Sequence, residues 1–283
     1  MIEVVYILYS IGVILCVVTI LLLYVVFGSE EIITRNIHHW VFYDKSTKKI
    51  MYHQSNPFYR RFNDLYMSNT VKTELITTVQ DFNKHSNSFK EKNVPRSLRL
   101  ILSGKEGIGK TTLTETIASE FEYGIIHFPK NNYSEKMIHS FFKSINLTTH
   151  NIITFDNIDF NSIIYYNRQL YDLLAELIIK NDKNNIFIFT FSDLNTIPST
   201  FTSNFHIHHH YHMDTHINYI MKMISDQLNK TNANENNEKK LKEIKENLLQ
   251  LNHKITPGYI IPYLAFNEDF QKSLDRFFAI IKH

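Results

Sequence analysis

A glycine-rich segment in the middle of the chain carries residues whose types and spacing suit the binding of a phosphate chain. It reads Gly104-Lys105-Glu106-Gly107-Ile108-Gly109-Lys110-Thr111-Thr112, and its first eight positions fit the pattern G-x-x-x-x-G-K-[ST]. Glycines at these positions let successive backbone N–H groups turn toward a β-phosphate. Lys110 would reach the β- and γ-phosphates, and the Thr111 hydroxyl would be a ligand of Mg²⁺. We therefore predict that residues 104–112 bind a nucleoside triphosphate and that Lys110 is catalytic.

An acidic residue at the end of a second apolar segment is the candidate partner of that metal ion. Asp156 follows the apolar residues 151–155 and lies 46 positions beyond Lys110. An Asp in this place holds Mg²⁺ in P-loop nucleotide hydrolases. The sequence therefore predicts a magnesium site formed by Thr111 and Asp156, with Asp156 also catalytic.

The segments around the glycines predict the elements that would position these side chains. Residues 97–103 indicate a buried strand, and residues 112–121 continue with helical character, which is the strand–loop–helix order that the motif requires. Residues 186–190 form a continuous apolar run of the kind that a parallel sheet buries on both faces. These patterns predict an α/β fold.

Composition excludes several classes of protein. The 30 basic and 28 acidic side chains give a formal net charge of +2, so neither nucleic-acid binding nor a nucleic-acid motor is favoured. Cys16 is the only cysteine, which excludes an internal disulfide framework and a cysteine-rich zinc site.

The N-terminal segment predicts a membrane anchor. Residues 4–27 contain no charged side chain and would span about 36 Å as a helix, more than the roughly 30 Å of a bilayer core. A cleaved signal peptide fits less well, because Glu3 precedes the segment and no basic residue does. Arg35, Lys45, Lys48 and Lys49 follow it, which predicts a single-pass protein with its bulk on the cytosolic or matrix-equivalent side.

Four features together resemble the AAA-family ATPases. Within that family the resemblance is closest to the membrane-anchored mitochondrial chaperones that assemble respiratory complex III by translocating its Rieske iron–sulfur protein. The features are the N-terminal apolar segment, Asp81-Phe82 with Asn93-Val94-Pro95-Arg96, the run Phe155-Asp156-Asn157-Ile158-Asp159, and the run Ile255-Thr256-Pro257-Gly258-Tyr259-Ile260-Ile261-Pro262-Tyr263-Leu264.

The resemblance implies a P-loop NTPase core with a five-stranded parallel sheet, flanking helices, a C-terminal helical lid and a homo-oligomeric ring. The strands are expected near residues 98–103, 124–128, 151–155, 186–191 and 206–211. The expected parts are a transmembrane helix at 4–27, a small connector at 28–66 with some β structure, a nucleotide-binding core at 67–213 and a lid at 214–283. The implied function is that of a membrane-anchored ATPase that binds Mg-ATP and couples its hydrolysis to remodelling or translocating a protein client.

The chain departs from the family at the positions that would activate water. Asn157 stands where the family has a second acid, and an amide cannot accept a proton. The segment after residues 186–191 usually holds an Asn in the family, and here Ser192 or Asp193 would have to orient the water. Residues 199–205 hold none of the arginines that reach a neighbouring subunit's γ-phosphate in the family, so Arg168 or a lysine would have to supply that charge. Two hypotheses follow: a slow ATPase, or an ATP-binding structural or assembly scaffold with little hydrolysis.

A cluster of histidines near residue 210 has two interpretations. On a strand, His206, His208, His210 and His212 would share one face and could bind a transition metal. Alternatively, residues 206–211 are the fifth strand of the sheet, and these imidazoles are solvated or packed.

Overall fold

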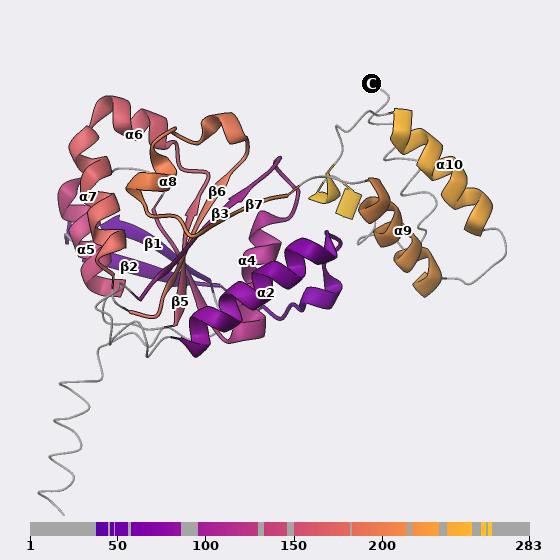
Figure 1. Cartoon of the computed structure of the whole chain (residues 1–283), viewed down its shortest axis with the longest axis horizontal. Coiled ribbons are helices and arrows are strands. Elements are labelled where there is room, and N and C mark those ends of the chain that lie inside the picture. Colours follow the sequence, from indigo (N-terminus) through magenta and orange to yellow (C-terminus); the bar gives the residue numbers. More distant parts are fainter. Residues whose placement is uncertain are drawn as a thin grey trace, which may run out of the picture. The chain divides into compact units, whose positions relative to one another are not determined.

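A seven-stranded sheet organises the part of the chain that the structure describes (Figure 1). The computed structural model describes residues 38–44, 46–47, 49–55, 58–85, 96–129, 133–145, 150–181, 183–213, 217–231, 237–250, 256–258 and 260–261. The strands, in chain order, are β1 (His38–Asp44), β2 (Lys49–Gln54), β3 (Leu98–Ser103), β4 (Gly124–His127), β5 (Asn151–Asp156), β6 (Ile186–Phe191) and β7 (His209–His212).

Helices connect the strands and continue beyond the sheet. The α-helices, in chain order, are α2 (Asn69–Lys84), α4 (Lys110–Phe121), α5 (Glu135–Ile145), α6 (Phe160–Tyr166), α7 (Arg168–Ile179), α8 (Phe201–Asn204), α9 (Ile217–Thr231) and α10 (Asn237–Gln250). Two short 3-10 helices, η1 (Phe62–Asp64) and η2 (Leu194–Thr196), lie in connecting segments.

The strand order is β2-β1-β4-β5-β6-β3-β7, and all neighbouring strands run parallel except β1 and β2. The α/β fold and the five expected parallel strands are confirmed, but the fifth begins at His209 rather than at 206. His206 has a φ of 47°, a left-handed conformation that belongs to a turn and not to a strand.

The sheet has seven strands rather than five because a hairpin from the segment before the core extends it. β1 and β2 pair antiparallel, and residues 38–40 of β1 pair in parallel with residues 125–127 of β4. The hairpin thereby supplies hydrogen-bond partners to an edge of β4 that would otherwise be exposed.

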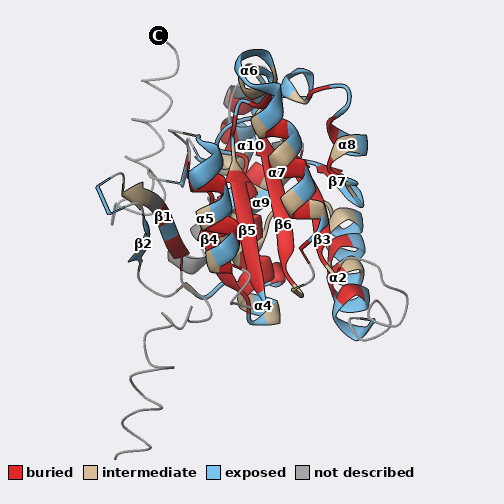
Figure 2. Ribbon diagram, turned by 90° about the vertical axis from the view of Figure 1, so that its left-hand side faces the viewer, coloured by how far each residue is buried: buried red, intermediate tan, exposed pale blue. Residues whose placement is uncertain are grey.

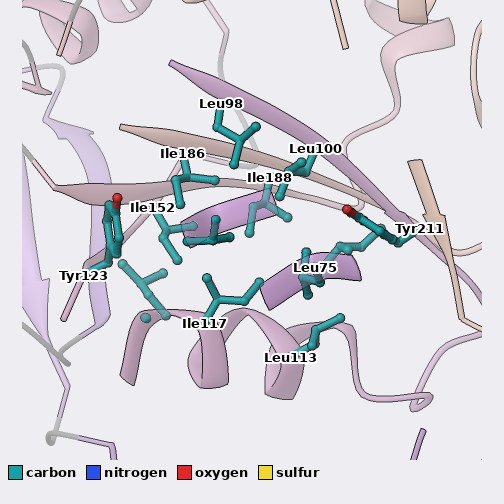
Figure 3. Close-up of a cluster of buried hydrophobic side chains, with 14 of the residues drawn as sticks. Leu75, Leu98, Leu100, Leu113, Ile117, Tyr123, Ile152, Ile186, Ile188 and Tyr211 are labelled. Carbon is teal, nitrogen blue, oxygen red and sulfur yellow. The ribbon is translucent and has the colours of Figure 1, made fainter. Parts of the chain in front are cut away.

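Both faces of the central strands are buried, since helices cover the sheet on each side (Figure 2). One face packs against α2 and α4 (Figure 3). Its side chains come from alternate strand positions and from these two helices: Leu98, Leu100, Ile152, Ile186, Ile188, Leu75, Leu113 and Ile117. The period of two along β6 places Phe187 and Phe189 on the opposite face.

The opposite face is covered by aromatic side chains. Phe155 and Phe189 stack with ring centroids 4.8 Å apart, and Phe160 of α6 meets Phe201 of α8 edge to face, also at 4.8 Å. Further buried aromatic side chains of this layer are Phe141, Tyr171, Phe187 and Phe205. The strands are held in place because both of their faces are buried between two layers of helices. Their polar ends, where the candidate site lies, are therefore held in place as well.

Two further helices, α9 and α10, follow the sheet and contact each other. Among the described residues, no helix is long and apolar enough to cross a membrane. The predicted anchor at residues 4–27 lies outside the described residues.

Candidate nucleotide-binding site

The glycine-rich segment forms the loop between β3 and α4, as the motif predicts. Gly104, Gly107 and Gly109 have φ values of 144°, 74° and 108°, which residues with a side chain rarely adopt. Gly109 is the N-cap of α4, and its carbonyl oxygen accepts a hydrogen bond of 2.8 Å from the N–H of Leu113. The helix N-terminus that follows the loop therefore favours an anion at this point.

Lys110 lies at the start of α4, and its side chain folds back over the loop. Its Nζ donates hydrogen bonds to the carbonyl oxygens of Gly104, at 2.5 Å, and Lys105, at 3.0 Å. Burial lowers the pKa of this ammonium, while the charges of Asp156 and Glu106 act in the opposite direction. A cation that is 6% exposed and bonded to neutral carbonyl groups would gain from an anionic partner such as a phosphate oxygen.

Asp156 ends β5, and a neighbouring strand holds its carboxylate. The Thr190 hydroxyl of β6 donates a hydrogen bond of 2.7 Å to Oδ1 of Asp156, and these two residues are paired in the sheet. The same hydroxyl accepts a hydrogen bond of 2.9 Å from the N–H of Asn157. Thr190 therefore positions the candidate metal ligand, a role that sequence reasoning missed although it is the single polar residue in its strand.

Asn157 and Asp159 follow, and neither places a free carboxylate beside Asp156. Asn157 lines the pocket and has a φ of 49°, a conformation that Asn tolerates better than most residues. Asp159 is the N-cap of α6, where its carboxylate accepts hydrogen bonds from the N–H and the hydroxyl of Ser162, at 3.0 and 2.5 Å. These bonds lower the pKa of Asp159 and engage the carboxylate in capping.

A pocket of about 630 Å³ is lined by most of the predicted residues, but Gly104 and Lys105 are not among the described residues that line it. It is lined by residues 106–113 of the loop and α4, by Asp156 and Asn157, and by two parts of the chain that were not predicted to contribute. Ser192 lies just beyond β6 and is not among the described residues that line this pocket, so its role stays a prediction.

One unpredicted wall comes from residues before α2 and the other from residues after β7. The lining residues from these parts are Arg60, Asp64, Leu65, Tyr66, Met67, Met213, Tyr219, Met223, Pro257, Gly258 and Ile261. Most are apolar, which suits a nucleobase, whereas the loop end is rich in N–H donors and suits phosphates. The last described segment, which begins at Thr256, is bonded to the loop. The Thr256 hydroxyl donates a hydrogen bond of 3.0 Å to the Glu106 carbonyl oxygen.

The donor set also fits the predicted metal ion. Thr111 and Asp156 both line the pocket and offer a hydroxyl and a carboxylate, the hard oxygen ligands that Mg²⁺ prefers. Together with the loop and Lys110, they form a polar end that fits a polyphosphate carrying this ion.

The histidines near residue 210 do not share one strand face as the metal hypothesis requires. His206 and His208 precede β7, and His208 accepts a hydrogen bond of 3.0 Å at Nδ1 from the N–H of Arg99. His210 and His212 are both within hydrogen-bond distance of the Ser103 hydroxyl, at 2.8 and 2.9 Å. In the part of the chain that the structure describes, no group of three or more metal-binding side chains gathers.

Residues 100–213 match the model of a family described as the ATPase family associated with various cellular activities (AAA). This part of the chain, 114 of its 283 residues, is similar to AAA domains. The match includes residues 100–103 of β3, the phosphate loop, Asp156 and the strands β4 to β7.

Two solved structures resemble the chain in fold. A crystal structure of the FIGL-1 AAA domain has a TM-score of 0.52 and 18% sequence identity over 70% of this chain and 68% of that chain. A crystal structure of the FIGL-1 AAA domain in complex with ADP has a TM-score of 0.55 and 15% identity over 80% of this chain and 85% of that chain. No curated protein sequence matches the chain. The AAA fold is therefore shown, whereas membership of the complex III assembly chaperones is not.

Proposed function

We propose that the protein is an AAA ATPase that binds Mg-ATP and hydrolyses it slowly. The observation that carries this proposal is the single pocket that Lys110, Thr111 and Asp156 line together, at the C-terminal ends of the parallel strands. Backbone N–H groups of residues 107–111 would hold the β-phosphate, and Lys110 would bind the β- and γ-phosphates. Thr111 and Asp156 would hold Mg²⁺, which neutralises negative charge that develops on the phosphates.

The pocket explains why slow turnover is expected. Asn157 stands beside Asp156 and can orient a water molecule through its amide but cannot take its proton. Asp159, the nearest acid along the chain, accepts hydrogen bonds from Ser162. Residues 199–205 contain no arginine. The site therefore offers little help in removing a proton from the attacking water. It also offers little help in stabilising the negative charge that develops on the phosphates.

The proposal also covers where the protein is located and what ATP hydrolysis would drive. The charge-free residues 4–27 would anchor the protein in a membrane as a single-pass segment, with the AAA domain on the cytosolic or matrix-equivalent side. Subunits would form a homo-oligomeric ring that remodels or translocates a protein client, as the resemblance of the sequence to anchored AAA chaperones implies. The short segment between 28 and 66 argues against transfer of the Rieske-protein task itself.

A second candidate function is an ATP-binding structural or assembly scaffold with little hydrolysis. The amide of Asn157 at the water-activating position and the capping role of Asp159 favour it. In this case nucleotide would stabilise one arrangement of the protein, and the cycle would end by dissociation of intact ATP.

Phosphate release by the full-length chain in detergent or lipid nanodiscs separates the two. The variants are Lys110→Ala and a matched control, Lys136→Ala, whose side chain is exposed on α5 away from the pocket. An ATPase releases phosphate in the wild type and in the control, and Lys110→Ala abolishes the release. ATP binding without release that depends on Lys110 would contradict the enzyme and support the scaffold.

A further inference from the structure

Arg60 brings a positive charge to the wall of the nucleotide pocket from a part of the chain outside the AAA match. It precedes η1 and lines the pocket together with Thr111, Thr112 and Leu113 of α4. Its N–H donates a hydrogen bond of 3.1 Å to the Ser119 hydroxyl, so the backbone at Arg60 is fixed against α4.

One edge of the Arg60 guanidinium, at Nε, is held by a hydrogen bond to Glu115. Its Nε donates a hydrogen bond of 2.5 Å to Oε2 of Glu115 on α4, and the side chains are 48% and 15% exposed, respectively. A guanidinium carries five N–H donors in a plane, and this bond uses one of them. The Nη edge is the part of Arg60 that can turn to a ligand in the pocket.

Glu115 is itself fixed by a chain of buried side chains. Nε2 of His38 lies 2.9 Å from Oε1 of Glu115, Nδ1 of His38 lies 2.6 Å from Nε2 of His127, and Nδ1 of His127 lies 2.8 Å from the Thr154 hydroxyl. With both imidazoles neutral, Thr154 can donate to His127, His127 to His38 and His38 to Glu115, so each bond has one proton. Burial acts to raise the pKa of Glu115, and its bonds to His38 and Arg60 outweigh this and lower it.

The position of Glu115 along α4 indicates which part of a nucleotide Arg60 would meet. Glu115 lies five residues beyond Lys110, or about 7.5 Å along the helix axis. Lys110 serves the β- and γ-phosphates, whereas Arg60 lines the pocket with the segment that also supplies Leu65 and Met67, whose apolar side chains suit the other end of the ligand. The phosphate nearest that end is the α-phosphate, and a planar guanidinium suits phosphate oxygens better than it suits an apolar base.

We propose that Arg60 binds the α-phosphate of the nucleotide through its Nη edge, while Glu115, supported by His38 of β1, holds the guanidinium in place. This inference rests on the proposed nucleotide binding and deepens it. The β1–β2 hairpin would then be part of the nucleotide site, because His38 supports the carboxylate that aligns Arg60. Since the α-phosphate stays bound throughout hydrolysis, Arg60 contributes to affinity more than to the chemical step.

Binding of ATP, ADP, AMP and adenosine to the full-length chain tests the proposal, with the weaker ligands measured by competition against a fluorescent ADP analogue. The variant is Arg60→Gln, and the matched control is Arg61→Gln, which removes the same charge from an adjacent exposed residue outside the pocket lining. We expect Arg60→Gln to weaken ATP, ADP and AMP by a similar factor of about ten to a hundred, with adenosine and the control unchanged.

Other outcomes overturn the proposal in distinguishable ways. If Arg60→Gln binds all four ligands as the wild type does, Arg60 does not contact the nucleotide. If adenosine is weakened as much as AMP, the contact is with the base or sugar, or the effect is structural. If the wild type itself binds no ADP, the proposed function fails and this inference fails with it. Unchanged circular dichroism and thermal unfolding of the variant confirm that it is folded.

Discussion

The backbone N–H of Gly258 donates a hydrogen bond of 2.8 Å to the carbonyl oxygen of Gly107, in the middle of the phosphate loop. The two glycines are so close that a Cβ on Gly258 would lie 2.8 Å from the Gly107 Cα and 2.9 Å from its oxygen. The last described segment of the chain thus touches the loop backbone directly. A change in the conformation of the loop on nucleotide binding would therefore displace this segment. A displacement of the segment would in turn change the affinity of the loop for nucleotide.

Gly258→Ala tests this contact. The added methyl group needs the loop or the facing segment to move, which costs about 1–3 kcal/mol in a packed site. We expect the affinity for ADP to fall by about tenfold. Equilibrium binding of a fluorescent ADP analogue measures this, and urea unfolding shows whether global stability accounts for it. Unchanged affinity and stability would mean that the segment does not rest on the loop in solution.

Thr190→Val removes the hydroxyl that holds Asp156 while keeping the branched shape of the side chain. Thr190 is 3% exposed, so its partners lose a bond that water cannot easily replace. We expect a loss of about 1–3 kcal/mol in the free energy of unfolding. A higher Mg²⁺ concentration should also be needed for half-maximal ATP binding.

Thr190→Ser is the control, because it keeps the hydroxyl. It should retain the Mg²⁺ dependence of the wild type even if the lost methyl group lowers stability. A valine variant with wild-type Mg²⁺ dependence would show that the bond from Thr190 does not position a metal ligand.

Asn157→Asp places a carboxylate at the water-activating position without changing the size of the side chain. Asp also tolerates the left-handed backbone found there. If proton removal limits turnover, we expect the rate of phosphate release to rise about tenfold to a hundredfold. Asn161→Asp adds the same charge on α6 outside the pocket lining and should leave the rate unchanged. No acceleration in Asn157→Asp would mean that a missing base is not what limits turnover.

We expect His208 to make the free energy of unfolding depend on pH. Burial, followed by the charge of Arg99, lowers the pKa of His208 from 6.5 to about 4. Between these values the unfolded chain binds the proton and the folded protein does not, so the free energy of unfolding falls as the pH falls from 6.5 to 4. Above pH 6.5 both states hold the ring neutral, and the effect disappears.

His208→Asn should reduce this acid sensitivity. The amide oxygen can replace Nδ1 as acceptor for the Arg99 N–H and does not titrate in this range. We expect the loss of stability between pH 6.5 and 4 to be smaller by about 1 kcal/mol, less than the full pKa difference implies because solvent reaches part of the ring. Urea unfolding at pH 8, 6.5, 5 and 4 measures it. Parallel curves for the two proteins would rule out His208 as the source.

The strands and the phosphate loop could be predicted from the sequence because their signals are local. Five of the six residues in 186–191 are apolar, and three glycines with Lys110 match the spacing of a phosphate-binding loop. The same is true of α2, where Leu75, Val79 and Phe82 recur at helical intervals and are buried. Each of these patterns is formed by residues of a single loop, helix or strand, so it can be recognised without knowing the rest of the fold.

The rest of the site depends on long-range register. Arg60 meets Glu115 across 55 positions and Thr190 meets Asp156 across 34. The pairing of β1 with β4, which brings His38 to His127, joins residues 89 positions apart. No local pattern marks such partners, so the position of Arg60 at the pocket, the Thr190 bond and the pairing of β1 with β4 became visible only in the fold.

Calorimetric titration of the full-length chain with Mg-ADP tests nucleotide binding by the phosphate loop most directly. We predict that the wild type binds one ADP per chain and that Lys110→Ala weakens the affinity by roughly tenfold to a hundredfold, because a charge-assisted phosphate contact is lost. Equal affinity in the two proteins, or no binding by the wild type, would contradict it.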